Sequence, residues 1–377
     1  MEFDFVVIGA GIAGLSVAAE LSRTARVAIV ERESQPGYHA TGRSAALYSE
    51  IYGNATIRSL TRASGAFYFR PPTGFSDHPL VAKRGTLYFA QQHEVDALNT
   101  FADSLATESR PVRLDATQTR NLIPAFRADY LGGSLYEAGS ADIDVSAVIQ
   151  GYAAQCRRQN VHVAFDSPVL SLTRKNGKWV VQIAGALLSA KVVVNAAGAW
   201  GDDVAKLGGV KPVGLIPKRR TAVLIEVPNG AAARHWPAAI HVGETFYFKP
   251  DAGLLLVSPA DETPSLPCDA QPEELDVAIA VDKFEQASGA SIQRLKSSWA
   301  GLRTFVADKT PVVGFDPGAP GFFWLVGQGG YGIQTAPALA RVACALALGE
   351  TMPEDVTSQG LRVDAISPNR DGLSRAA

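Results

Sequence analysis

Three glycines near the start of the chain, Gly9, Gly11 and Gly14, have the spacing of a loop that binds a phosphate group. Gly9 permits a tight turn, Gly11 lets backbone amides approach a pyrophosphate, and Gly14 lets a helix pack close to a strand. Glu31 follows about 20 residues later, where a carboxylate would accept hydrogen bonds from a ribose. These residue types in this order predict a dinucleotide site.

For this chemistry the glycines must join a strand to a helix, because the anion then rests on the amides of a helix N-terminus. Residues 3–8 form an apolar run that predicts the strand, and apolar residues recur at helical spacing over 12–21. Residues 27–30 predict a second strand that ends at Glu31. The alternative, a glycine turn in an ordinary α/β unit, is disfavoured because every part of the pattern is present.

The composition, with 47% hydrophobic and 19% charged residues in a chain of 377, is that of a globular protein with a large core and two domains. A net charge of −2 offers no basic surface to nucleic acid. Cys156, Cys268 and Cys344 are widely spaced, which excludes a disulfide scaffold and predicts no metal site. No apolar stretch predicts an integral membrane segment, and Glu2 and Asp4 stand where a signal peptide would be basic. The predicted location is the cytoplasm, with peripheral association with a membrane as the alternative.

Helical and strand patterns alternate along the rest of the chain. Residues 55–70 and 333–348 predict helices, residues 161–195 predict an antiparallel meander, and residues 211–305 are rich in strands. The chain therefore alternates between two domains, each discontinuous in sequence, and crosses between them four times. The first domain is predicted over residues 1–80, 140–210 and 306–377, and the second over residues 81–139 and 211–305.

Five segments act together: the glycine loop with Glu31, and residues 40–46, 194–200, 299–303 and 329–335. As a set they resemble the D-amino-acid oxidase and glycine oxidase family of FAD flavoproteins, and within it the bacterial D-arginine dehydrogenase branch. The resemblance covers nearly the whole chain. It implies an α/β fold in which a Rossmann-type FAD domain joins an α+β substrate domain built on a mixed, largely antiparallel sheet, with the flavin ring at the junction.

The resemblance assigns FAD contacts along much of the chain. The pyrophosphate would meet the glycine loop, the adenosine ribose Glu31 and Arg32, and the adenine Val169. The implied cofactor-binding residues are Gly9, Gly11, Ala13, Gly14, Glu31, Arg32, Thr41, Gly42, Arg43, Ser44, Ala45, Ala46, Val169, Ala197, Gly198, Gly330, Tyr331, Gly332 and Ile333. Some relatives link the flavin to a histidine in a context like that of His39, but the D-arginine dehydrogenase branch carries the same residues unlinked, so non-covalent FAD is expected.

Oxidation of an amino acid by a flavin requires that the substrate carboxylate be held while Cα–H points at flavin N5. A guanidinium suits this task, because its planar fork pairs both carboxylate oxygens. By resemblance, Arg220 and Arg303 bind the carboxylate, Tyr247 touches it, and Tyr52 closes over it from a mobile loop. The alternatives are a surface basic patch for Arg220 and ordinary structural positions for the tyrosines.

Two positions depart from the D-arginine dehydrogenase branch. Thr86 stands where the arginine-preferring relative has a glutamate for the basic side chain, and Leu47 stands in place of a histidine near the flavin. Without that glutamate a buried guanidinium would lack a counter-charge. We therefore predict oxidative deamination of a D-amino acid with a neutral or apolar side chain. The predicted substrate-binding residues are Ser44, Leu47, Ser49, Thr86, Ala238, Ile240, Gly301 and Gly330, the last two through carbonyls that accept from the amine.

Other reactions remain open on the same scaffold. One is oxidation of glycine, sarcosine or another secondary amine, and another is dehydrogenation of a 2-hydroxyacid, which would not need the amine acceptors. A flavin-binding module without activity is disfavoured because the arginines, tyrosines and glycines occur together. The sequence leaves open the electron acceptor (oxygen, a quinone or a carrier), the stereochemistry beyond the resemblance, and the oligomeric state.

Overall fold

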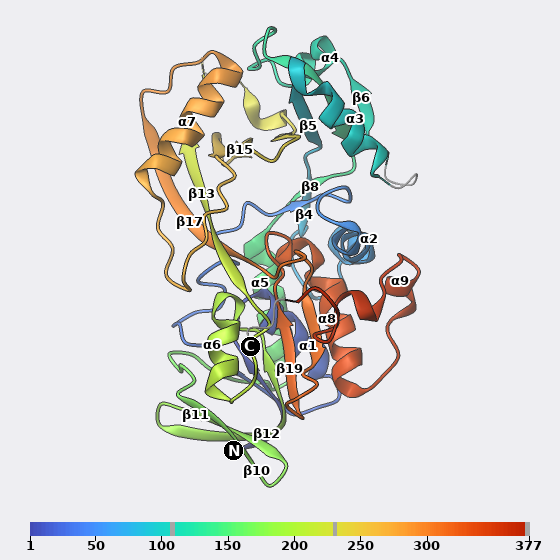
Figure 1. Ribbon diagram of the computed structural model, residues 1–377, viewed down its shortest axis with the longest axis vertical. Helices are drawn as coiled ribbons and strands as arrows, with labels where there is room; N and C mark the ends of the chain where they lie inside the picture. The colour runs from blue at the N-terminus through green and yellow to red at the C-terminus, as the bar shows by residue number, and fades with distance from the viewer. Residues whose placement is uncertain (106–109, 229–231, 374–377) are drawn as a thin grey trace.

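The computed structural model describes residues 1–105, 110–228 and 232–373. Its described strands form two large sheets of eight strands each and a small three-stranded sheet. In Figure 1 one large sheet lies in the lower half of the molecule and the other in the upper half, with the small sheet between them. The small sheet consists of β3 (Leu47–Tyr48), β8 (Ala141–Ile143) and β4 (Val81–Lys83).

The lower sheet has a parallel centre. Strand β1 lies between β2 and β12 and is parallel to both, while β9 and β19 extend the parallel set. Strands β11 and β10, and strand β18 next to β19, are added antiparallel on the side of β12 that faces away from β1. This order confirms the predicted Rossmann-type sheet. Its strands are β1 (Glu2–Ile8), β2 (Val27–Val30), β9 (His162–Ala164), β10 (Ser171–Lys175), β11 (Lys178–Ile183), β12 (Ala186–Asn195), β18 (Val312–Phe315) and β19 (Phe322–Val326).

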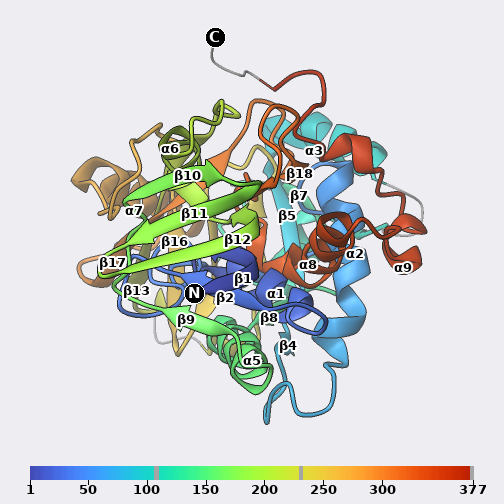
Figure 2. The same cartoon turned by 90° about the horizontal axis from the view of Figure 1, so that it is seen from below.

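The predicted meander over residues 161–195 is correct only in part. Strands β10, β11 and β12 form an antiparallel meander, whose broad strands are seen from below in Figure 2. Strand β9 instead pairs in parallel with β2, with Ile29 opposite Val163. A helix over Val145–Arg158 precedes β9 and brings the chain into the lower sheet parallel to β2.

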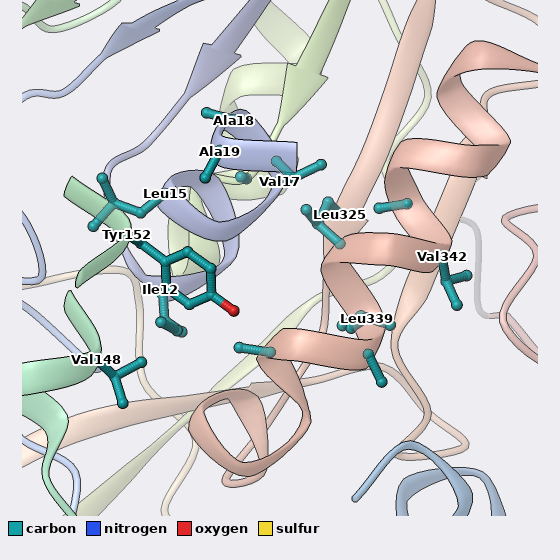
Figure 3. Close-up of a cluster of buried hydrophobic side chains, with 14 of the residues drawn as sticks. Ile12, Leu15, Val17, Ala18, Ala19, Val148, Tyr152, Leu325, Leu339 and Val342 are labelled. Carbon is teal, nitrogen blue, oxygen red and sulfur yellow. The ribbon is translucent and has the colours of Figure 1, made fainter. Parts of the chain in front are cut away.

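Helices cover the parallel centre and bury its apolar face. Figure 3 shows Ile12 and Leu15 of α1 (Ile12–Leu21) packed with Val148 and Tyr152 of α5 (Val145–Arg158). Helix α8 (Gly332–Leu348) packs on the same cluster, as does α2 (Ala55–Phe69). This core fixes the N-termini of α1 and α8. The shorter helices are α3 (Val95–Asp103), α4 (Ala116–Leu122), α6 (Gly201–Leu207) and α9 (Glu354–Thr357).

The upper sheet is antiparallel except where β14 runs parallel to β5. Strands β13 and β17 pair along most of their length and extend from the upper sheet toward the lower one (Figure 1). Helix α7 (Glu274–Ser288) packs on one face over an apolar core. In order across the sheet, the strands are β17 (Leu295–Phe305), β13 (Ile216–Ile225), β16 (Leu254–Ser258), β15 (Tyr247–Asp251), β14 (Ala238–His241), β5 (Thr86–Gln91), β7 (Leu131–Glu137) and β6 (Val112–Leu114).

The fold class is thus the predicted one, a parallel Rossmann-type sheet with a mixed, largely antiparallel second sheet. Strands of the lower sheet come from residues 2–30, 162–195 and 312–326, and those of the upper sheet from residues 86–137 and 216–305. The predicted domain boundaries themselves stay a prediction. In the part of the chain that the structure describes, no helix is long and apolar enough to cross a membrane.

Candidate active site at the junction of the two large sheets

An elongated cavity of about 390 Å³ begins at the carboxyl ends of β1, β2 and β12 and reaches β13 and β17. Ligands of open α/β sheets bind at such strand ends, and this volume falls in the range of ligand sites. Fifteen of the predicted cofactor residues line it: Gly9, Gly11, Ala13, Glu31, Arg32, Thr41, Arg43, Ser44, Ala45, Val169, Ala197, Gly198, Gly330, Gly332 and Ile333. Gly14, Gly42, Ala46 and Tyr331 lie outside its lining.

The glycine loop allows three backbone segments to meet. Gly9 has a φ of +103°, and a Cβ there would lie 2.6 Å from the carbonyl oxygen of Ala196 at the end of β12. A Cβ at Gly14 would lie 1.8 Å from the carbonyl oxygen of Gly9, so α1 can pack this close to β1 only without a side chain at that position. At the start of α1, Gly11 provides no side-chain cap. The Ile12 amide donates to the Thr41 hydroxyl at 3.1 Å, so the amides that follow it in the first turn of α1 are the ones that can meet an anion in the cavity.

The Glu31 carboxylate is held in place where β2 ends. Its Oε2 accepts a hydrogen bond from the Ala10 amide at 2.6 Å and its Oε1 accepts one from the Glu33 amide at 2.9 Å. Beside it, the Arg32 guanidinium lies 4.8 Å from the centre of the Trp200 ring. An oriented carboxylate beside a stacked cation and indole suits the binding of a ribose and a planar base.

Arg43 differs from its predicted role in one respect. It lines the cavity, but its Nη1 donates to the carbonyl oxygens of Ala270 and Ala300, and its Nη2 pairs with Asp269. The indole of Trp299 donates back to the Arg43 carbonyl at 3.2 Å. The Arg43 guanidinium thus links the loop before β3 to β17. Its hydrogen bonds hold these two parts of the chain together.

Arg303 and Tyr52, predicted to hold the substrate carboxylate, lie together. Nη1 of Arg303 donates to the Tyr52 phenol oxygen at 3.2 Å, and Arg303 lines the cavity. Burial raises the pKa of the Tyr52 phenol, so its hydroxyl stays protonated and available as a donor. Gly330 packs on the guanidinium, because a Cβ there would lie 2.7 Å from Nη1 of Arg303. Tyr52 itself is outside the described cavity lining.

The register of the upper sheet brings the other predicted groups onto the same face. Arg220 of β13 is directly opposite Gly301 of β17, and Gly301 precedes Arg303 by two residues. Directly paired residues and residues two apart on a strand lie on the same face of a sheet, so Arg220 and Arg303 share a face. Arg220, Tyr247 and Gly301 all line the cavity. Nε of Arg220 donates to the Asp261 carbonyl oxygen at 2.8 Å, and its Nη2 lies 3.5 Å from Glu262. Arg220 is therefore a buried residue of the site, which contradicts the alternative of a surface basic patch.

Most residues predicted to surround the substrate side chain do not line the cavity. Leu47 and Ile240 belong to an apolar cluster with Tyr88, which Tyr247 borders. Thr86, opposite Ala238, uses its hydroxyl on Ser140 at 2.6 Å. Of the predicted substrate residues, Leu47, Ser49, Thr86, Ala238 and Ile240 lie outside the described lining of the cavity, whereas Ser44, Gly301 and Gly330 line it.

Some residues in or near the site were not predicted. Glu137 at the end of β7 lies outside the cavity lining and is half-buried, and desolvation raises its pKa to about 7 although hydrogen bonds from Ser49 and the Glu50 amide oppose the shift. Its signal in the sequence, one acid at the end of an apolar strand, is too common to single it out. Trp200 and Gln328 line the cavity and lie within or beside segments that the sequence did identify.

Comparison with known proteins agrees with this geometry. The family model described as DAO, FAD dependent oxidoreductase, matches residues 4–346. The chain therefore belongs to the DAO family of FAD-dependent oxidoreductases, and it is an enzyme whose cofactor is FAD. Its known relatives include glycine oxidase of Pseudomonas putida, 24% identical over 367 residues that cover 93% of this chain and 95% of the relative.

Solved structures share the fold across the full length. Glycine oxidase from Geobacillus kaustophilus superposes with a TM-score of 0.81 at 20% identity, covering 96% of this chain and 99% of that one. L-amino acid deaminase from Proteus vulgaris superposes with a TM-score of 0.79 at 16% identity, covering 98% and 97%. At these identities the likeness establishes the fold alone. The predicted relation to the D-arginine dehydrogenase branch is not among these findings.

The residues at the cavity fit FAD. Backbone amides at the start of α1 suit a pyrophosphate, and Glu31 suits a ribose. Helix α8 starts at the other end of the cavity with neither a side-chain cap nor an acidic residue in its first turn, which favours negative charge on a reduced flavin. Nδ1 of His39 is buried and lacks a partner among the described residues, so it is available to a bound group.

Proposed function

We propose that the protein oxidises a D-amino acid with a neutral or apolar side chain to the imino acid, which water hydrolyses to a 2-keto acid and ammonia. The observation that carries this proposal is that two arginines, Arg220 and Arg303, line the same cavity as Gly301 and Gly330 and as the predicted FAD residues. The arginines suit a carboxylate and the carbonyls of Gly301 and Gly330 suit an amine. Together they would fix Cα between the two groups.

Each residue has a distinct part in this proposal. Arg303 would pair with the substrate carboxylate, and the protonated phenol of Tyr52 would donate to it beside Nη1. Arg220 and Tyr247 would complete the binding from β13 and β15. FAD, when bound, supplies the acceptor for the hydride that leaves Cα. No side chain is assigned as general base, because water can take the proton from the amine.

The surroundings favour a neutral side chain. The face of the upper sheet beyond Tyr247 carries the apolar cluster that contains Leu47, Tyr88 and Ile240. The hydroxyl of Thr86 is already bonded to Ser140, and both oxygens of Glu137 already accept hydrogen bonds. A cationic side chain would therefore have to displace existing hydrogen bonds to find a counter-charge.

Two finer points belong to the same proposal. We propose that the chain is related to the D-arginine dehydrogenase branch, which its sequence segments resemble, and that it acts on a different substrate. FAD is held without a covalent bond, because the branch that the sequence resembles carries the same residues at positions 39–42 unlinked. Precipitation with acid should then release all of the flavin, whereas flavin retained on the denatured protein would contradict this point.

The function can be tested by mixing the FAD-loaded protein anaerobically with single compounds and following the loss of flavin absorbance. The panel contains D- and L-amino acids, N-methyl amines and 2-hydroxyacids. Rapid bleaching by neutral D-amino acids is expected. D-arginine as the best substrate would overturn the side-chain assignment, and failure of every amino compound would overturn the proposal.

Oxidation of a secondary amine such as sarcosine is the second candidate. It is favoured by the similarity to glycine oxidase over almost the whole of both chains. The two candidates share the carboxylate ligands and differ in the amine. Faster bleaching by N-methylglycine than by any primary D-amino acid would select this reading, whereas bleaching only by hydroxyacids would select a 2-hydroxyacid dehydrogenase.

A further inference from the structure

The segment that carries Tyr52 has little structure of its own. It links β3, which ends at Tyr48, to α2, which begins at Ala55, and it contains Gly53 with a φ of +86°. A connection of this kind has many accessible conformations unless other groups hold it. Yet the Tyr52 phenol lies within hydrogen-bond distance of Arg303. Contacts with other parts of the chain must therefore hold the segment in this conformation.

Glu137 is bonded to this segment at two adjacent residues. Its Oε2 accepts from the Ser49 hydroxyl at 2.6 Å, and its Oε1 accepts from the Glu50 amide at 2.7 Å. The Ser49 hydroxyl also lies 3.0 Å from the Tyr88 phenol oxygen on β5. Glu137 and Tyr88 belong to neighbouring strands of the upper sheet, so the segment is attached to a rigid element close to Tyr52.

The charge of Glu137 has no other evident use. Across residues 1–105, 110–228 and 232–373, Glu137 takes part in no ion pair. Burying a carboxylate without a cation is costly unless hydrogen bonds compensate. The compensating donors here are those of the Tyr52 segment, so the cost of burying the acid is linked to the conformation of that segment.

We propose that Glu137 is a positioning residue that holds residues 49–51 against the upper sheet and thereby places Tyr52 at Arg303. The inference rests on the proposed function, since it takes Tyr52 and Arg303 as ligands of a carboxylate. Glu137 itself does not touch the substrate. Its effect on binding passes entirely through the phenol of Tyr52.

Benzoate is a suitable probe, because it offers a carboxylate without a reactive amine and its binding beside an oxidised flavin changes the flavin spectrum. FAD-loaded wild type, Glu137→Ala, Tyr52→Phe and the double variant are titrated with benzoate. Glu137→Ala and Tyr52→Phe should each weaken binding by about 10-fold, the loss of one hydrogen bond to a charged group. The double variant should bind no more weakly than Tyr52→Phe alone, because both changes remove the same contact.

If the fold-losses of the two single variants multiply in the double variant, the proposal is overturned, because Glu137 would then act independently of Tyr52. Unchanged binding in Glu137→Ala or in Tyr52→Phe would do the same. Glu137→Gln should bind benzoate within about 3-fold of wild type, because the amide can accept from Glu50 and donate to Ser49. If Glu137→Ala fails to fold or load FAD, Ser49→Ala takes its place in the same cycle with Tyr52→Phe and the same criterion.

Asp202→Asn is a matched control. Asp202 also holds a segment through backbone amides, those of Val213, Gly214 and Leu215, but none of its hydrogen bonds reaches the Tyr52 segment. The Asp202→Asn variant should bind benzoate within about 2-fold of wild type. In the double variant of Asp202→Asn and Tyr52→Phe, the fold-changes of the two single variants should multiply. Arg303→Lys separates the two proposals. Unchanged benzoate binding in Arg303→Lys contradicts the proposed function, whereas weakened binding there with unchanged binding in Glu137→Ala contradicts only the role of Glu137.

Discussion

The Tyr52 phenol accepts a hydrogen bond from the Arg303 guanidinium across 3.2 Å, although 251 residues separate them in the chain. Tyr52 comes from the segment before α2, and Arg303 comes from β17 of the upper sheet. The backbone of Gly330, just before α8, lies against the same guanidinium. Three distant parts of the chain therefore meet at the Arg303 guanidinium.

Arg303→Lys should lower kcat/KM by about 100-fold with the best substrate of the panel. Lysine keeps the charge but loses the planar fork, and a hydrogen bond to a charged group contributes about 1.5–3 kcal/mol. Steady-state kinetics test this expectation, and the flavin content should equal that of wild type because Arg303 belongs to the substrate end of the cavity. A kcat/KM within about 3-fold of wild type would exclude Arg303 from substrate binding.

Gly330→Ala should weaken benzoate binding by at least about 10-fold. The new Cβ would lie 2.7 Å from Nη1 of Arg303 and would push the guanidinium away from its present position. Gly139→Ala is the control, because a Cβ there meets nothing within 4 Å. If both variants bind benzoate like wild type, the contact between Gly330 and Arg303 has no part in recognition.

Glu31→Ala should weaken FAD binding by about 10-fold to 100-fold. It removes the acceptors for the ribose and leaves the Ala10 amide, now 2.6 Å from Oε2, without its partner. Quenching of flavin fluorescence during titration of the apoprotein gives the dissociation constant. Glu2→Ala, which removes only a surface ion pair with Lys178, should leave FAD affinity unchanged, and an equal loss in both variants would contradict the role of Glu31.

Glu137→Gln should change how stability depends on pH. Burial raises the pKa of Glu137 from 4.5 to about 7, so the folded protein binds more protons than the unfolded chain between these values. The wild-type contribution is therefore fully present below about pH 4.5 and is lost as pH rises toward 7, by at most about 3 kcal/mol.

Urea unfolding with saturating FAD at several pH values tests this expectation. The glutamine variant cannot titrate, so its stability relative to wild type should increase from the lower to the upper end of that range. The titratable groups nearest Glu137 are Glu50, Tyr48 and Tyr88, and none of them is changed in the comparison. A difference that is independent of pH would show that Glu137 is not the titrating group.

The cofactor half of the site could be predicted from the sequence because its signals are local. The strand, turn and helix around Gly9 and Gly14 lie within a few residues of one another, and the distance to Glu31 is one short crossover. Gly14 lies so close to the Gly9 carbonyl that a side chain would not fit there. The glycine spacing therefore predicts how the strand and helix pack.

The substrate half depends on register, which the sequence does not specify. Strand β17 was not predicted, since residues 295–298 combine one apolar residue with lysine and two serines and gain their order from pairing with β13. The opposition of Arg220 to Gly301 follows from that pairing alone. For the same reason Glu137 could not be related to Tyr52, because their connection passes through the Ser49 side chain and the Glu50 amide.

The glycine loop and the proposed carboxylate ligands, Arg220 and Arg303, are built on different sheets, and Arg43 connects to the upper sheet through the carbonyl of Ala300 and to Ala270. Under the proposed function, a substitution on the upper sheet could change which substrate is accepted while the glycine loop holds the coenzyme as before. A substitution at Arg43 would instead disturb both parts at once, because its hydrogen bonds connect them.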